Sequence, residues 1–353
     1  MNCGCGAIWA QGSRRAASRS IRTLTFWIAS IGRMEMLTST VIRMVADKEA
    51  LLDPAVGRHG HAVFLGLVER MAPTLAEWLH GPAPLKPFTV SPLQGKFTPI
   101  RRPNGVKMRV TAGETYWMRF TTLSQAVFQP FLAAFLDRPG TSVGQPPFYL
   151  RLQDAYFMVT EVITTPSSET IWSGYTEWER LLQEARPEWE ITVQFYSPTT
   201  FRQNGINVVD PRPELVFGSW WAKWRAFAPA EYQTAYLRDG EAPSKDASSG
   251  AGSEIFGRIG ISALAIRTRM LDFGTFKQVG FVGRVTYDLS RLSDTERWWL
   301  NVLADFAFYA GTGAKTTMGM GQTRRLRRCG EFPADHNDQR ESPGPEDGAS
   351  SGE

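Results

Sequence analysis

The sequence predicts an α+β protein built from two units, each with the element order β-α-β-β-α-β. Segments rich in β-branched or alternating apolar residues are interspersed with segments whose apolar residues recur every three or four positions. The same succession occurs twice, between residues 36 and 163 and again between residues 190 and 326. The chain has 353 residues, which is long enough for two domains, and its 12 Trp and 21 Phe can fill a core in each.

The first unit begins with a segment at 36–46 whose β-branched residues predict a strand. Apolar residues at helical spacing predict a helix at 61–71, and Pro73 opens a second apolar run that predicts a short helix ending near His80. The remaining elements expected in this unit are strands at 86–93 and 115–121, an amphipathic helix at 124–137 and a strand at 148–163.

The second unit follows a helical segment at 175–184. Its expected elements are a strand at 190–196, a tryptophan-rich helix at 214–227, strands at 259–270 and 280–289, a helix at 295–309 and a last strand at 319–326. A low-complexity insert at 240–252 predicts a flexible surface loop. This element order is that of the ferredoxin-like, or RRM-like, fold. The sequence therefore predicts two such domains in tandem, at 34–187 and 188–330, with the tryptophans of the 214–227 helix in the core.

The ends of the chain differ in composition from its middle. Residues 1–33 hold five arginines and no acid, whereas residues 331–353 hold seven acids and one arginine. We interpret the first segment as a disordered or spurious leader, with translation starting at Met34 or Met36, and the second as a disordered acidic tail. The residues between them carry a net charge of +5, which permits a polyanionic partner without requiring one.

The cysteines point to a reducing compartment. Only Cys3, Cys5 and Cys329 occur, and they offer neither a disulfide framework nor a zinc site. No apolar run approaches the ~20 residues that a membrane-spanning helix needs. The sequence therefore predicts a cytoplasmic protein with no metal, no cofactor and no membrane segment.

A glycine-rich stretch at 309–325 joins the last helix to the last strand and places four glycines around Lys315 and three threonines. Glycine allows positive φ, so successive N–H groups can face one concave surface that suits phosphate. A nucleotide-binding P-loop is excluded, because Ala314 stands where that motif needs glycine and the order is helix, loop, strand. A tight turn after a helix is the simpler explanation, but four glycines with a lysine exceed what a turn requires.

Five segments carry a resemblance to a known family: 79–93, 196–201, 213–224, 277–283 and the glycine-rich stretch. The glycine-rich stretch resembles the C-terminal loop of the repeat-associated (RAMP) superfamily of CRISPR proteins, which bind RNA. Taken in this order, the five segments resemble one family of that superfamily, the CRISPR-associated repeat-processing endoribonucleases, or sixth Cas family. The resemblance spans residues 36–328.

The resemblance implies a metal-independent endoribonuclease that cuts precursor CRISPR RNA within each repeat to give mature guide RNAs. In such enzymes the ribose 2′-OH attacks the adjacent phosphate and leaves a 2′,3′-cyclic phosphate and a 5′-OH. This chemistry needs a base, an acid and positive charge near the phosphorane. The expected partner is CRISPR repeat RNA, as precursor and product; a homodimer and transfer of the product to an effector complex are left open. The alternative is a non-catalytic RAMP subunit that binds guide RNA in an effector complex.

Histidine suits both proton transfers, because its ordinary pKa of ~6.5 is close to working pH. The resemblance implies that His80 is catalytic, although a histidine at a helix C-terminus is explained more simply by the helix dipole. Lys86, six residues later, matches a lysine that some archaeal relatives pair with this histidine. Those relatives also use a tyrosine from the preceding helix, and 61–71 has none. Three options follow: His61 as base, His59 as base, or His80 with electrostatic help alone.

The predicted RNA contacts lie in and near the glycine-rich stretch. They are Gly311, Gly313, Lys315, Thr316, Thr317, Gly319, Gly321, Lys277 and Arg325. Alternation along the last strand would put Arg325 and Arg327 on one face.

Overall fold

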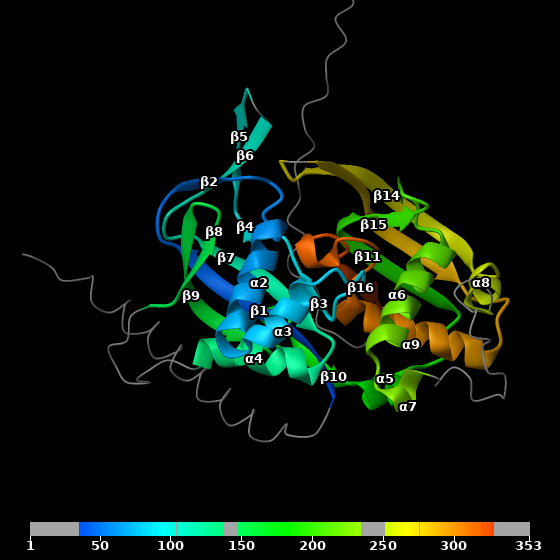
Figure 1. Ribbon diagram of the computed structural model, residues 1–353. Helices are drawn as coiled ribbons and strands as arrows, with labels where there is room; N and C mark the ends of the chain where they lie inside the picture. The colour runs from blue at the N-terminus through cyan, green and yellow to red at the C-terminus, as the bar shows by residue number, and fades with distance from the viewer. Residues whose placement is uncertain (1–34, 104, 137–146, 234–250, 275, 328–353) are drawn as a thin grey trace, which may run out of the picture.

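The computed structural model describes residues 35–103, 105–136, 147–233, 251–274 and 276–327. The expected leader, the acidic tail and nearly all of the low-complexity insert lie outside these residues. Two α+β units lie side by side, the first blue to green and the second green to red in Figure 1. Within the described ranges, no helix is both long enough and apolar enough to cross a membrane.

The first unit is an antiparallel sheet with helices packed against it. The strand order is β3-β7-β1-β9-β8, with β10 paired to β1 and β4 paired to β7. The strands are β1 Met36–Ala46, β3 Phe88–Val90, β4 Gln94–Gly95, β7 Thr115–Thr122, β8 Tyr149–Leu152, β9 Ala155–Ile163 and β10 Gly174–Glu177. Helices α2 Gly57–Met71, α3 Pro73–His80 and α4 Gln125–Leu136 lie over the sheet (Figure 1). A smaller sheet of β2 Ala50–Leu52, β6 Gly105–Val110 and β5 Thr98–Arg102 extends from this unit.

The second unit has a four-stranded sheet in the order β14-β15-β11-β16. Its strands are β11 Glu190–Thr199, β14 Gly260–Asp272, β15 Lys277–Asp288 and β16 Thr323–Leu326, and β12 Phe201–Gln203 pairs with β13 Ile206–Val208 as a hairpin. The helices are α5 Trp178–Glu184, α6 Pro213–Phe227, α7 Ala230–Gln233, α8 Ala251–Phe256 and α9 Asp294–Ala310. Trp220 and Trp224 of α6 have no exposed surface, which confirms that they belong to the core.

Strand order confirms the predicted fold class. When the four principal strands of each unit are numbered along the chain, both sheets have the spatial order 4-1-3-2. This is β9-β1-β7-β3 in the first unit and β16-β11-β15-β14 in the second. Both units therefore have the ferredoxin-like arrangement that their element order predicts.

Several expected boundaries were wrong for local reasons. The strand expected at 148–163 is the hairpin β8-β9, which turns at Gln153 with a φ of 53°. The last strand begins only at Thr323, because Gly319 and Gly321 have φ values of 93° and 68° that no strand allows. The segment expected to be helical from residue 175 starts as strand β10, and α5 begins at Trp178.

The sequence interpretation also missed the β12-β13 hairpin. Its two-residue turn is Asn204-Gly205, with φ values of 48° and 79°. Asn-Gly between two short strands is a strong sequence signal for such a turn, so this element was predictable.

The C-terminus of α9 lies at the junction between the two units. The last carbonyls of a helix have no partner within the helix, and this end of the dipole attracts positive charge. Side chains from both units bind these carbonyls: Arg119 of β7 donates to Phe308 O, Thr121 of β7 to Tyr309 O and Lys223 of α6 to Ala310 O. The start of the glycine-rich stretch is thereby fixed between the units.

Candidate active site

The glycine-rich loop, residues 311–322, is folded against the protein. Its amides donate mainly to internal acceptors: Gly311 N to Ala307 O, Thr312 N to Gly321 O, Gly313 N to Ser219 Oγ, Ala314 N to Thr200 O and Gly321 N to Pro198 O. Added Cβ atoms would collide with backbone, at 2.3 Å from Thr200 O for Gly313 and 2.1 Å from Thr312 O for Gly321. Close packing explains these glycines. Contact of the loop with RNA phosphate stays a prediction.

Inside the loop, Thr316–Met318 form a 3-10 turn, η2, between two residues with left-handed backbone, Lys315 and Gly319. This turn lies against the first residues of α2. A Cβ on Gly57 would be 2.3 Å from the carbonyl oxygen of Met318, so only glycine permits the contact. The side chains on the same face of α2 are thereby brought next to the turn.

His61 lies four residues after Gly57, one helical turn along that face. The Thr317 backbone acts on the His61 imidazole and raises its pKa, which is the effect of an acceptor that favours the protonated ring. Its Nδ1 is buried and has no hydrogen-bond partner in the described structure. The ring centroid is 5.5 Å from that of Phe88. Burial has the largest effect on the pKa of His61 and lowers it, which favours the neutral ring.

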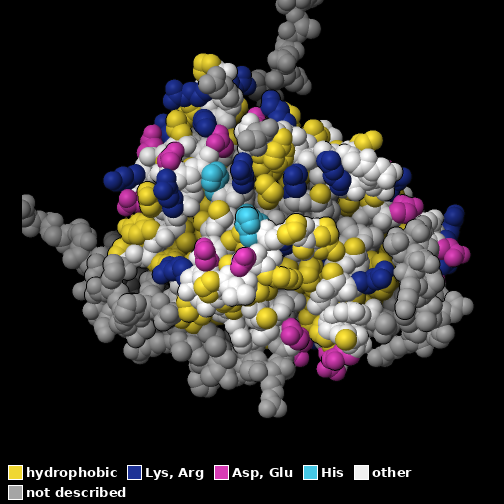
Figure 2. All heavy atoms as spheres, in the orientation of Figure 1, with side chains coloured by type: hydrophobic (Ala, Val, Ile, Leu, Met, Phe, Trp, Pro, Cys, Tyr) yellow, Lys and Arg dark blue, Asp and Glu magenta, His cyan; other side chains and the backbone are white. Residues whose placement is uncertain are grey.

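His80 and Lys86 lie near His61, and their charges lower its pKa further. His80 is the exposed last residue of α3. The Lys86 Nζ donates to Gly81 O at 2.5 Å, and partial burial lowers the pKa of Lys86. The structure thus groups both residues predicted to be catalytic with one of the two candidate bases. Figure 2 shows histidine side chains near the middle of one face of the molecule, among side chains of Lys and Arg.

Comparison with known proteins identifies the family. The Cas6 N-terminal domain matches residues 36–183, and the CRISPR-associated endoribonuclease Cas6 domain matches residues 193–323. A solved Thermus thermophilus Cas6 product complex is 30% identical with a TM-score of 0.63, and the alignment covers 82% of this chain and 100% of that one. The chain belongs to the Cas6 family. A second Cas6 product complex is 26% identical with a TM-score of 0.59, over 83% of this chain and 100% of that one.

The curated relatives are CRISPR-associated Cas6 endoribonucleases from two strains of Mycobacterium tuberculosis. Each is 33% identical to this chain over 141 residues. The matched region spans 40% of this chain and 40% of each of those relatives.

In this Cas6 family member, the other candidate base, His59, lies apart from the histidine pair. It lines an open hollow of about 700 Å³ together with Arg70 and residues of the β8-β9 hairpin. Burial is the main effect on the pKa of His59 and lowers it, the neighbouring Arg58 charge lowers it further, and the carboxylates of Asp53 and Asp154 act in the opposite direction. Of the two candidates, only His61 shares its surroundings with His80.

The side chains predicted to bind RNA have differing surroundings. Lys315 is half-buried, its Nζ lies 4.4 Å from the ring centroid of Phe276, and burial lowers its pKa. The hydroxyl of Thr316 is turned inward and accepts a hydrogen bond from the protein. Lys277 is exposed, with its Nζ 3.8 Å from a carboxylate oxygen of Asp272. The side chains of Lys315 and Lys277 therefore keep solvent-facing surface that RNA can meet.

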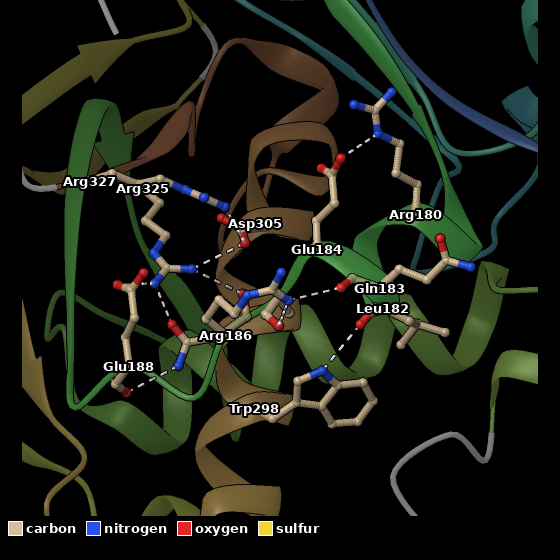
Figure 3. Close-up of polar contacts among 12 residues, drawn as sticks. Arg180, Leu182, Gln183, Glu184, Arg186, Glu188, Trp298, Asp305, Arg325 and Arg327 are labelled. Atoms are coloured by element: carbon tan, nitrogen blue, oxygen red, sulfur yellow. Dashed lines mark hydrogen bonds and ion pairs between the residues drawn. The ribbon is translucent and has the colours of Figure 1, made fainter. Parts of the chain in front are cut away.

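Arg325 lies inside the protein (Figure 3). Its side chain is only 5% exposed and pairs with Glu188 at 2.7 Å and with Asp305 at 3.1 Å. Arg327, directly after β16, binds the same Asp305 at 3.0 Å, so the two arginines point to the same side of the chain. Because its guanidinium also donates to Asn301 Oδ1, Arg325 joins β16 to α9, and we do not retain it as an RNA contact.

One relevant residue escaped the sequence interpretation. Lys223 of α6 is 2% exposed, its Nζ donates to Ala310 O and to Thr316 Oγ1, and burial lowers its pKa to about 7. A signal for it exists, since Lys223 falls within the apolar stripe that carries Trp220 and Trp224. A lysine at such a position must find an internal acceptor.

Proposed function

We propose that this chain is a metal-independent endoribonuclease that cleaves precursor CRISPR RNA within its repeats to release mature guide RNAs. The observation that carries the proposal is the grouping of His80 and Lys86 with His61, on the face of α2 that contacts the η2 turn. Solved Cas6 structures similar to this chain include product complexes and a substrate mimic complex, which supports a processing reaction.

His61 is the proposed base for the 2′-OH. Burial lowers the pKa of His61, which favours the neutral ring near pH 7, and we assign the ring proton to the nitrogen other than Nδ1. The lone pair on Nδ1 is then the proton acceptor. Since Nδ1 is buried, a small movement of the ring or of η2 must accompany the approach of the hydroxyl. Catalytic hydrogen bonds commonly tighten only in the substrate complex.

His80 is the proposed acid that protonates the departing 5′ oxygen. It is exposed, its charge is felt at His61, and a cation at the end of α3 is favoured by the helix dipole. Lys86 supplies positive charge for the phosphorane. Lys315, which lies against Phe276, and the adjacent Lys277 are proposed to contact the RNA backbone. The proposed base, the proposed acid and the lysine that stabilises the phosphorane supply the roles that cleavage by a 2′-OH requires. Lys315 and Lys277 would add binding to the RNA backbone.

Cleavage of a labelled repeat RNA from the host's own CRISPR array, in EDTA, tests this function. We expect a single cut by the wild type, blocked when the nucleotide upstream of the cut is 2′-deoxy. His80→Ala should lower the single-turnover rate by about 10²- to 10⁴-fold, as loss of a proton-transfer group does.

Binding of the 2′-deoxy repeat, measured by fluorescence anisotropy, is the control and should be similar for both proteins. Binding by both with cleavage by neither would overturn the proposal and favour the guide-RNA-holding subunit. Cleavage that survives in His80→Ala would remove His80 from the mechanism.

A further inference from the structure

Lys223 is buried without a carboxylate. In the described residues no acid forms an ion pair with it, and its two acceptors are Ala310 O and Thr316 Oγ1, the latter at 3.0 Å. Burying an amine is costly unless its N–H groups find partners. Here the partners are the last residue of α9 and the first residue of η2. Lys223 therefore links Ala310, directly before the glycine-rich loop, to Thr316 in the middle of that loop.

The η2 turn connects Lys223 to His61. Thr316 accepts a hydrogen bond from Lys223, and Met318 of the same turn is in backbone contact with Gly57, one helical turn before His61. The Thr317 backbone between them acts on the His61 imidazole. Peptide planes are rigid, and this turn is short and bounded by left-handed residues at both ends. Displacement of Thr316 must therefore move the Thr317 backbone as well.

We propose that Lys223 is a positioning residue for RNA cleavage: by holding Thr316 it sets the η2 turn, whose Thr317 backbone orients the His61 imidazole. This inference rests on the proposed function, because His61 must act in the reaction for its orientation to matter. Misplacement of a reacting group by about 1 Å can cost about 100-fold in rate. The effect is therefore kinetic and separate from RNA affinity.

Comparison with a second buried basic residue, Arg119, shows why the positioning role is assigned to Lys223. Arg119 also binds the end of α9, through Phe308 O at 2.5 Å. Its other acceptors are Ser39, Trp172 and Gln322, all outside η2. Both side chains donate to carbonyls at the end of α9, but of the two only Lys223 reaches the η2 turn.

The first experiment changes the hydroxyl and leaves the buried amine in place. Thr316→Val removes the acceptor of Lys223 at constant shape, Thr316→Ser keeps it, and Thr312→Val is the matched control. Thr312 is a buried threonine of the same loop, bonded to Trp220 and Thr323 and not to Lys223. We expect the single-turnover rate on repeat RNA to fall about 10-fold in Thr316→Val and to stay within twofold in the other two. The Kd for 2′-deoxy repeat should stay within twofold in all.

The pH–rate profile separates positioning from a merely structural role. The groups that act on the pKa of His61 are His80, Lys86 and the Thr317 backbone, and the Thr317 backbone raises it. If η2 moves, that effect weakens, so the acidic limb of the profile should shift to lower pH in Thr316→Val and in Lys223→Met. Should Lys223→Met fail to fold, Thr316→Val still decides the question.

A wild-type rate and an unshifted limb in Thr316→Val would overturn the inference while leaving the proposed function intact. A rate loss accompanied by an equal loss of RNA affinity would overturn it too, because it would indicate a binding role. Absence of cleavage by the wild type would overturn both the inference and the function on which it rests.

Discussion

Helix α2 carries two histidines two residues apart, and the fold gives them opposite surroundings. His61 faces the η2 turn, His80 and Lys86, whereas His59 lines an open hollow and lies near Arg58 and the carboxylates of Asp53 and Asp154. Successive side chains on a helix point about 100° apart, so a step of two positions reverses the environment. The comparison shows that the helix face on which a histidine lies, and whether that face contacts the glycine-rich loop, decides which of the two histidines can take part in catalysis.

The same division applies to the glycines of α2. A Cβ added to Gly57 would lie 2.3 Å from Met318 O of the η2 turn, whereas a Cβ added to Gly66 would meet nothing within 4 Å. One face of the helix is therefore sterically fixed by the loop and the other is not. Variants on the two faces should behave differently in both catalysis and stability.

The largest expected contrast is catalytic. His61→Ala should lower the single-turnover cleavage rate by about 10²- to 10³-fold, because it removes the proposed base. His59→Ala should change the rate less than threefold. Rates at saturating protein on repeat RNA measure both, and circular dichroism confirms folding. Equal losses in the two variants would show that the division of α2 into two faces has no catalytic meaning.

A smaller contrast concerns stability. Gly57→Ala places a methyl 2.3 Å from Met318 O and should cost about 1–3 kcal/mol, since backbone must move. Gly66→Ala should instead gain about 0.5–1 kcal/mol, because alanine is the better helix former. Urea unfolding midpoints provide the measurement. A neutral Gly57→Ala would mean that α2 and η2 are not in firm contact.

Sequence reasoning located the elements and part of the site. The spacing of apolar residues and the composition of the segments were sufficient to predict the ferredoxin-like order of elements. The motif around the end of α3 indicated His80 and Lys86 as catalytic. The choice between His61 and His59 was out of reach, because it depends on which side of α2 contacts a loop more than 250 residues away. Local pattern carries no information on such a contact.

The loop itself was only partly predictable. Its glycines were expected to present amides to phosphate, yet Gly313 and Gly321 are needed for backbone contacts that only the folded chain reveals. From the sequence, Arg325 was predicted to contact RNA at the basic end of the last strand. Its partners Glu188 and Asp305 come from distant parts of the sequence, so the ion pairs could not be foreseen. Charge alone could not distinguish an RNA contact from an internal ion pair.

The smallest expected contrast is in the pH dependence of stability. Burial lowers the pKa of both histidines, so each is more easily protonated in the unfolded chain, where its pKa is ~6.5. The stability they contribute is therefore present above pH 6.5 and is lost as the pH falls through 6.5 towards the folded-state pKa. The midpoint of urea unfolding should accordingly decline between pH 7 and pH 5.

The two faces should differ in this decline. Near His61, the charges of His80 and Lys86 lower the pKa of His61 further, whereas near His59 the carboxylates of Asp53 and Asp154 oppose the lowering caused by burial and by Arg58. His61→Gln should therefore flatten the decline more than His59→Gln does. A larger flattening in His59→Gln would mean that the carboxylates do not offset its burial, and the electrostatic contrast between the two faces would have to be abandoned.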